Sequence, residues 1–167
     1  MGAFTIPFIP SDIPVGLVGY WKFNNDATDS SGKGYNLTAG GSPTYTANGN
    51  YWKDAYCTNT SSGKYFTKTR NADIDLIGAF TISLWVKANS GSSIYFLDKK
   101  GSTTGYGVLC DPAIRLIYNG AYLLTGPSIS LGKWTHIVCT YDQTTARMYI
   151  DGNSLRPYIN PISYTIF

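Results

Sequence analysis

The chain has 167 residues, which is enough for one domain with a sizeable core. Its net charge of +3 is modest, and its 13 lysines and arginines form no cluster, which argues against nucleic acid as a partner. Only 14% of the residues are charged, against about 25% in an average globular domain. Tyrosine and glycine are abundant instead, as suits a β-sandwich with a neutral polar surface. No apolar run approaches the roughly 18 residues of a membrane span.

The first 15 residues differ in composition from the rest of the chain. Ile6, Ile9 and Ile13 each precede a proline, and a proline forces the residue before it into extended backbone. We predict a stiff apolar arm over residues 1–15. It packs back on its own sandwich or docks on a neighbouring subunit, because its apolar side chains would be costly in water. This stretch lacks the basic region and the continuous apolar core of a secretory signal.

Short strands and loops are predicted for the next part of the chain. Leu17–Phe23 is predicted as the first strand, and Gly40–Asp54 as a long loop or a pair of short edge strands. Ala55–Thr60 and Lys64–Thr67 flank a Ser-Ser-Gly turn and are predicted to form a hairpin. Asp73–Leu76 is predicted as one turn of 3₁₀ helix or a tight loop.

Strands with frequent turns are also predicted for the second half. Asn119-Gly120 and Asp151-Gly152 are typical of tight hairpins, which need two residues with positive φ. The absence of helical periodicity predicts an all-β fold, an antiparallel β-sandwich. The predicted strands are Phe80–Lys87, Ser92–Asp98, Gly105–Cys110, Ala113–Tyr118, Ala121–Leu124, Trp134–Tyr141 and Ala146–Ile150.

Three motifs in this order resemble one family. The W-T-H-I-V strand at Trp134 with its following Y-I-D-G turn, the F-T-I-S-L-W-V strand at Phe80, and the G-Y-W-K-F strand with a D-S-S-G-K-G turn at Asp29 are similar to laminin-G-like, concanavalin A-like jelly-roll domains. The resemblance implies one sandwich over residues 16–167. It also implies core positions for Trp21, Phe80, Trp85 and Trp134.

The chain departs from that family at its C-terminus, where residues 162–167 stand in place of the closing strand. This segment substitutes for the missing strand, or the sequence is truncated, or an edge beside Leu17–Phe23 stays open for another chain. An open edge would make the chain a subunit of an assembly, such as a decoration or appendage protein of a virus particle.

The residues required for glycoside hydrolysis are missing. Enzymes on related jelly rolls use two carboxylates on one strand in an E-x-D-x-x-E pattern, whereas this sequence contains no glutamate. The single histidine, His136, matches a structural position of the family. We therefore expect a protein that is not an enzyme.

Calcium is the one cofactor that we consider. Asp26 and Asp29 in the first polar loop are candidate ligands, since calcium takes hard oxygen ligands; the alternative is that they are ordinary turn aspartates. Cys57, Cys110 and Cys139 lack the spacing of a zinc site. We expect Cys139 to be a small buried hydrophobe, and a Cys57–Cys110 disulfide is conceivable.

Aromatic residues outside the predicted core are candidates for stacking on a sugar. Tyr51 and Trp52 lie in a polar loop, and Tyr118, Asn119 and Tyr122 bracket a hairpin tip; the alternative for each is local packing. We expect a lectin-like recognition or adhesion module that binds glycan or protein at an extracellular or particle surface. The alternative is a structural subunit that contacts neighbouring copies through residues 1–15.

Overall fold

The computed structural model describes residues 15–47, 56–59, 63–91, 93–100 and 105–155. Most of the predicted arm, Tyr51, Trp52 and residues 162–167 lie outside these ranges. The chain divides into two compact units, residues 1–74 and residues 75–167, and each is described by itself. Apart from η1 (Ala72–Ile74), every regular element described is a β-strand, which confirms the all-β prediction and the predicted 3₁₀ turn.

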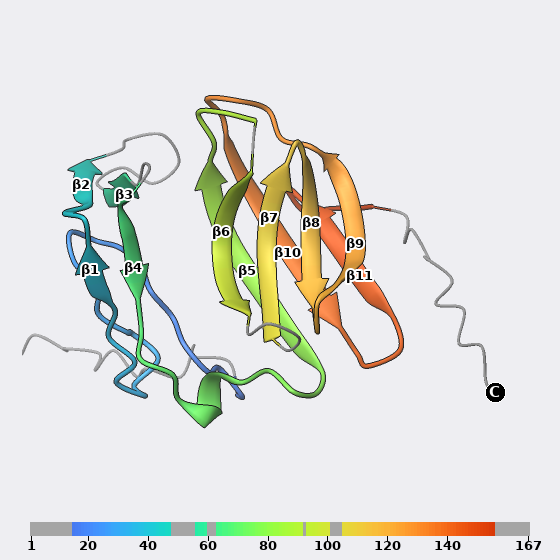
Figure 1. Cartoon of the computed structure of the whole chain (residues 1–167), viewed down its shortest axis with the longest axis horizontal. Helices are drawn as coiled ribbons and strands as arrows, with labels where there is room; N and C mark the ends of the chain where they lie inside the picture. The colour runs from blue at the N-terminus through green and yellow to red at the C-terminus, as the bar shows by residue number, and fades with distance from the viewer. Residues whose placement is uncertain (1–14, 48–55, 60–62, 92, 101–104, 156–167) are drawn as a thin grey trace, which may run out of the picture. The chain divides into compact units, whose positions relative to one another are not determined.

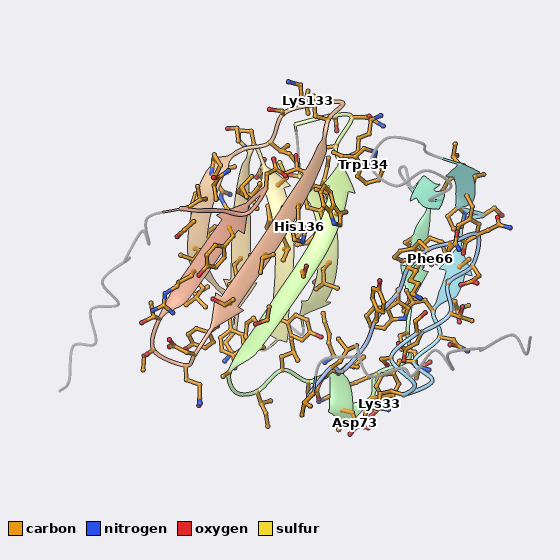
Figure 2. The ribbon with its side chains drawn as sticks, turned by 180° about the vertical axis from the view of Figure 1, so that it is seen from behind. Lys33, Phe66, Asp73, Lys133, Trp134 and His136 are labelled. Atoms are coloured by element: carbon orange, nitrogen blue, oxygen red, sulfur yellow. The ribbon has the colours of Figure 1, made fainter. Side chains whose placement is uncertain are left out.

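The first unit contains a two-part antiparallel ribbon (Figure 1). Its inner pair joins β2 to β3, and its outer pair joins β1 to β4. The strands are β1 (Thr38–Gly40), β2 (Thr44–Ala47), β3 (Tyr56–Asn59) and β4 (Tyr65–Thr67). The Phe66 ring, labelled in Figure 2, lies 5.1 Å from the Phe23 ring and 5.9 Å from the Tyr45 ring, so these rings form a small aromatic cluster.

The hairpin predicted between Ala55–Thr60 and Lys64–Thr67 is wrong. Both segments form strands, but each pairs with a strand earlier in the chain. Between the two pairs the backbones approach closely, since a Cβ on Gly41 would lie 1.8 Å from the carbonyl oxygen of Gly63. Strand propensity indicates that a segment is extended, but long-range pairing decides which partner it takes.

The strand predicted over Leu17–Phe23 is also wrong, because only a single bridge between Trp21 and Asp29 forms there. Phe23 has a positive φ of 53°, which ends the extended backbone. The N–H of Tyr20 donates to the Asp29 side chain. The Asp29 carboxylate thus accepts a hydrogen bond from a backbone N–H group that would have bonded to a neighbouring strand in a regular sheet.

The second unit is a sandwich of two four-stranded antiparallel sheets (Figure 1). One sheet has the order β12-β11-β10-β5 and the other β6-β7-β8-β9. All seven strands predicted in this part of the chain are present, with small shifts at their ends. The bounds are β5 (Phe80–Lys87), β6 (Ile94–Lys100), β7 (Gly105–Asp111), β8 (Ala113–Tyr118), β9 (Ala121–Ser128), β10 (Trp134–Tyr141), β11 (Ala146–Ile150) and β12 (Asn153–Ser154).

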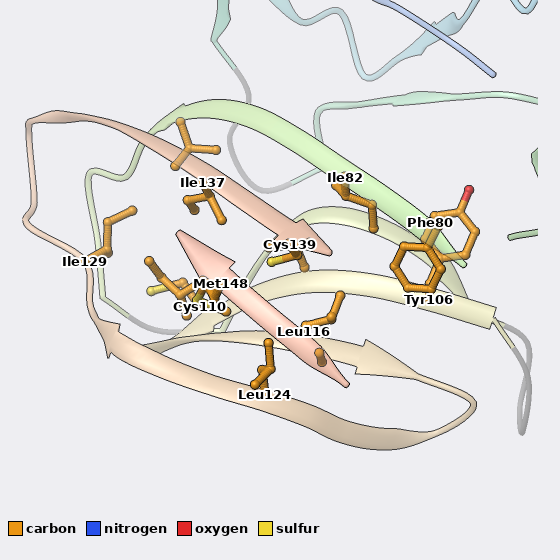
Figure 3. Close-up of a cluster of buried hydrophobic side chains, with 14 of the residues drawn as sticks. Phe80, Ile82, Tyr106, Cys110, Leu116, Leu124, Ile129, Ile137, Cys139 and Met148 are labelled. Atoms are coloured by element: carbon orange, nitrogen blue, oxygen red, sulfur yellow. The ribbon is translucent and has the colours of Figure 1, made fainter. Parts of the chain in front are cut away.

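Buried side chains from both sheets meet in one core (Figure 3). Ile137 and Cys139 on β10 face Leu116 on β8 and Cys110 on β7, and all four are fully buried. Burial raises the pKa of the Cys139 thiol to about 12. Cys110 is a free thiol too, so the conceivable Cys57–Cys110 disulfide is not formed. Each large apolar side chain buried here contributes about 1.5–3 kcal/mol.

The four aromatic residues expected in the core divide into buried and outward-facing ones. Phe80 is buried, but Trp85 is 39% exposed, so its predicted core position is wrong. Successive strand residues point to opposite faces; with Phe80, Ile82 and Val86 directed inward, Trp85 must point outward. Trp134 and Trp21 are partly buried and lie outside the core cluster.

Candidate functional site

The hairpin residues predicted to contact a sugar are placed in different environments. The Tyr118 ring packs 5.4 Å from that of Phe80 and 5.2 Å from that of Tyr141. Asn119 has a φ of 48°, and its side-chain oxygen accepts from the N–H of Gly105. Tyr122 is 52% exposed. Of the three, Tyr122 alone presents a large exposed ring.

Tyr122 belongs to a surface that the sequence did not reveal, on the outer side of the β6–β9 sheet. Cross-strand pairing aligns Tyr95, Leu109 and Arg115 in one row, and Ile117 with Tyr122 in the next. Because paired residues of an antiparallel sheet share a face, these five side chains lie together. We call them the tyrosine face. Figure 1 shows this sheet in front of β5, β10 and β11.

The central part of the tyrosine face, which we call its floor, is apolar and does not project into solvent. Leu109 and Ile117 point away from the sandwich core, yet only 4% and 5% of their surfaces are exposed. Gly107 pairs with Ile117 and has no side chain. Tyr95 and Tyr122 flank this floor from β6 and β9 and are 43% and 52% exposed. The face therefore offers aromatic rings beside a covered apolar surface.

Arg115 supplies the polar groups of the tyrosine face. Its guanidinium lies over the Tyr122 ring, 4.8 Å from the ring centroid, in the geometry of a cation–π contact. Its Nη1 atom is 3.8 Å from the Asp111 carboxylate, a long ion pair. These contacts hold a planar group with several N–H donors at the surface, where a ligand hydroxyl could accept from it.

The two calcium candidates lie in the loop of the first unit and serve as turn residues. Each carboxylate oxygen of Asp29 accepts two hydrogen bonds. Partial burial acts to raise the pKa of Asp29, but hydrogen bonds from the Ser31 hydroxyl and from the N–H groups of Tyr20, Ser31 and Tyr35 outweigh it and lower that pKa to about 2. Asp26 accepts from the N–H and hydroxyl of Thr28. Calcium binding stays a prediction.

A metal site elsewhere receives no support from the residues whose positions are described. Among them, no three histidine, cysteine, aspartate or glutamate side chains come together in a group that could hold an ion.

Lys33 and Asp73, labelled in Figure 2, belong to the first unit. There the Tyr35 hydroxyl donates to the Asp73 carboxylate over 2.5 Å, which raises the pKa of Tyr35.

A second exposed aromatic group was missed because Trp85 was assigned to the core. The Trp85 ring stacks on His136 with centroids 4.8 Å apart and planes 16° from parallel. The Nε2 atom of His136 lies 2.9 Å from the Ser83 hydroxyl. We call these three residues the Trp85 cluster; Figure 2 shows His136 and Trp134 along β10. The polar residues alternating with apolar ones around Trp85 were the signal that could have revealed it.

Comparisons with known proteins agree with the jelly-roll prediction. A family model described as the concanavalin A-like lectin/glucanases superfamily matches residues 59–156, more than half of the chain. The chain is similar in structure to domain 4 of AbnA, a GH43 extracellular arabinanase from Geobacillus stearothermophilus, in complex with arabinotriose. The TM-score is 0.63, the identity is 20%, and the match covers 83% of this chain and 72% of that chain. No curated protein matches the chain.

The described part of the chain contains no helix with the length and apolar composition needed to cross a bilayer.

Proposed function

The chain belongs to the concanavalin A-like lectin/glucanase superfamily, and from that premise we propose that it is a non-catalytic glycan-binding module whose sugar site is the tyrosine face. The observation that carries the proposal is the exposure of Tyr95 and Tyr122 beside the guanidinium of Arg115. Sugars combine apolar C–H surfaces with hydroxyl groups. Ligand sites match such molecules with aromatic side chains and a few placed polar groups.

The two tyrosines and Arg115 make different kinds of contact with the sugar. An exposed ring stacks on the C–H face of a sugar and removes apolar surface from water. Arg115 donates hydrogen bonds to hydroxyls on the same residue of the glycan. Because the cation–π contact and the ion pair to Asp111 already orient the guanidinium, little side-chain entropy is lost on binding.

The spacing of the tyrosines favours a short glycan chain over a single sugar. Tyr95 lies on β6 and Tyr122 on β9, with β7 and β8 between them. Three strand spacings amount to about 14 Å, which is longer than one sugar ring. The arabinotriose bound by the similar arabinanase domain makes arabino-oligosaccharides the first ligands to test.

The carboxylates near the tyrosine face do not suit hydrolysis. Asp98 pairs with Gly107, and Asp111 lies four positions further along β7. This separation is about 13 Å along an extended strand, beyond the ~5–9.5 Å between the two carboxyl groups of glycosidases. Incubation with oligosaccharides should therefore release no reducing ends, and a steady release would contradict the non-catalytic proposal.

The experiment that tests the site is isothermal titration calorimetry with arabinotriose and a panel of neutral oligosaccharides. We expect Tyr122→Ala to weaken binding about tenfold, equivalent to ~1.4 kcal/mol. Tyr65→Ala is the matched control, because Tyr65 is a 56% exposed tyrosine on β4 of the first unit and is not part of the tyrosine face. Equal affinity for the wild type and Tyr122→Ala would overturn the proposed site.

We further propose that the module acts in adhesion or recognition at an extracellular or particle surface. The extracellular origin of the similar arabinanase domain supports this location. A structural role in an assembly is the second candidate, and the observation that favours it is the apolar, proline-punctuated sequence of residues 1–15. Binding of the labelled protein to polysaccharide-coated beads, lost with Tyr122→Ala, would support adhesion over a purely structural role.

A further inference from the structure

One position of the tyrosine face, Gly107, leaves a hollow in the surface of the β6–β9 sheet. Cross-strand pairing aligns one residue from each strand in this row: Asp98, Gly107, Ile117 and Tyr122. A Cβ atom on Gly107 would lie 3.0 Å from the carbonyl oxygen of Leu97 and 3.9 Å from the Cα atom of Asp98. Among the described residues, no side chain from a neighbouring strand would lie within 4 Å of it.

Backbone conformation does not require glycine at this position. Gly107 is not among the glycines with positive φ. Its pairing with β6 and with β8 continues through the residues on either side without a register shift. A glycine inside a strand often marks a place where a ligand or another backbone comes close. Gly107 therefore matters through the space that it leaves, in addition to the close approach of the Leu97 carbonyl group.

The hollow and Arg115 lie on opposite sides of a line that joins the two exposed tyrosines. Tyr95 and Arg115 belong to one row, and Gly107 and Tyr122 belong to the next. A glycan that stacks on both tyrosines crosses β7 and β8 diagonally, so it passes between Arg115 and Gly107. Neighbouring strands are about 4.8 Å apart and successive residues on one face about 7 Å. One sugar ring on this line can therefore contact both.

We propose that the hollow at Gly107 binds the exocyclic hydroxymethyl group of a hexopyranose unit, so that hexopyranose glycans bind more tightly than pentopyranose glycans. The inference rests on the proposed function, because it assigns a subsite within the tyrosine face. In a linear chain such as a cello-oligosaccharide, each ring carries two vicinal hydroxyl groups on one edge and the hydroxymethyl group on the opposite edge. Arg115 donates to the first edge, while the hydroxymethyl group enters the hollow.

The residues that border the hollow suit both parts of a hydroxymethyl group. Ile117 on β8 offers apolar surface to the methylene carbon. Asp98 on β6 is directed to the outer side of the sheet, since the preceding residue, Leu97, packs against the core. A carboxylate accepts several hydrogen bonds at once, so Asp98 can accept from the ligand hydroxyl group. A pentopyranose has a hydrogen atom in place of this group and leaves the hollow to water.

Matched pairs of sugars test the subsite with the full chain. Cellotriose and xylotriose share their linkage, and methyl β-galactopyranoside and methyl α-L-arabinopyranoside share their ring stereochemistry. Within each pair, only the first sugar carries hydroxymethyl groups. In NMR titrations we expect the first sugar of each pair that binds to have about fourfold higher affinity, the effect of burying one methylene group.

The same titrations separate failure of this inference from failure of the proposed function. Equal affinities within a pair that binds overturn the inference. Binding of arabinotriose without binding of either pair also overturns it and leaves the proposed function intact. If no oligosaccharide binds at all, the proposed function fails and the inference fails with it.

Gly107→Ala tests the position of the subsite. Its methyl group would fill the hollow, so the affinity for the sugar with hydroxymethyl groups should fall to that for its partner sugar. Gly78→Ala is the matched control and should keep the preference, because a Cβ atom there would meet no described atom within 4 Å and Gly78 has no positive φ. Urea denaturation checks the fold, and Asp98→Ala should also reduce the preference if Gly107→Ala fails to fold. A folded Gly107→Ala protein that keeps the full preference overturns the assignment.

Discussion

The tyrosine face and the Trp85 cluster lie on outer faces of different sheets in the same sandwich, and both expose aromatic rings. The rings of the tyrosine face flank a covered apolar floor and a held guanidinium, on strands whose edges are bulged. The Trp85 ring stacks on His136, whose Nε2 atom contacts the Ser83 hydroxyl. The comparison shows that exposure alone does not assign a ligand: the tyrosine face combines its rings with a held guanidinium, whereas the Trp85 ring lies beside an imidazole and a hydroxyl group.

The largest expected effect comes from a substitution in the core of the sandwich, because both surfaces lie on strands that pack against this core. Ile137 is fully buried between the two sheets. Ile137→Ala should lower the free energy of unfolding of the second unit by about 2–5 kcal/mol, measured by urea denaturation. Val138→Ala is the control, because Val138 is the neighbouring partly exposed residue on β10. Similar losses for both variants would contradict the assignment of the core.

A smaller effect should separate the tyrosine face from the Trp85 cluster. Arg115→Ala should weaken oligosaccharide binding about two- to tenfold, the range of a typical hydrogen bond of ~0.5–1.5 kcal/mol. Arg147→Ala, on β11, is the control and should leave the affinity unchanged. Titration calorimetry is the measurement. Unchanged sugar affinity in Arg115→Ala would remove the polar part of the proposed site.

The complementary substitution is Trp85→Ala. It should leave the affinity for oligosaccharides unchanged, because Trp85 lies on β5 and outside the tyrosine face. Titration calorimetry is the measurement. A loss of sugar binding in a folded Trp85→Ala protein would transfer the glycan site from the tyrosine face to the Trp85 cluster.

The smallest expected effect lies in the first unit and should leave both surfaces untouched. The pKa of Asp29 is lowered to about 2 in the folded chain, below about 3.9 for an unfolded aspartate. Its contribution to stability is therefore present above pH 4 and is lost as the pH falls towards 2. Amide exchange of residues 20–37 should increase over that window. In Asp29→Asn it should be fast already at pH 5, and no difference from the wild type there would contradict the role of the carboxylate.

Local sequence determined most of the strands of the second unit. Alternating residues in β5 and β10, and the Asn119-Gly120 and Asp151-Gly152 turns with positive φ at all four residues, depend on neighbours in the chain. These signals were sufficient to predict the sandwich. They also contained the outward direction of Trp85, which the family resemblance obscured.

Tertiary structure decided what the strands bring together. Tyr95, Arg115 and Tyr122 come from three strands, and only sheet register places them on one face. The partners of β3 and β4 and the burial of Cys110 likewise follow from long-range contacts. Backbone preference acts over a few residues, whereas pairing and burial depend on groups far apart in the chain. For that reason the sequence alone predicted the sandwich but not the tyrosine face.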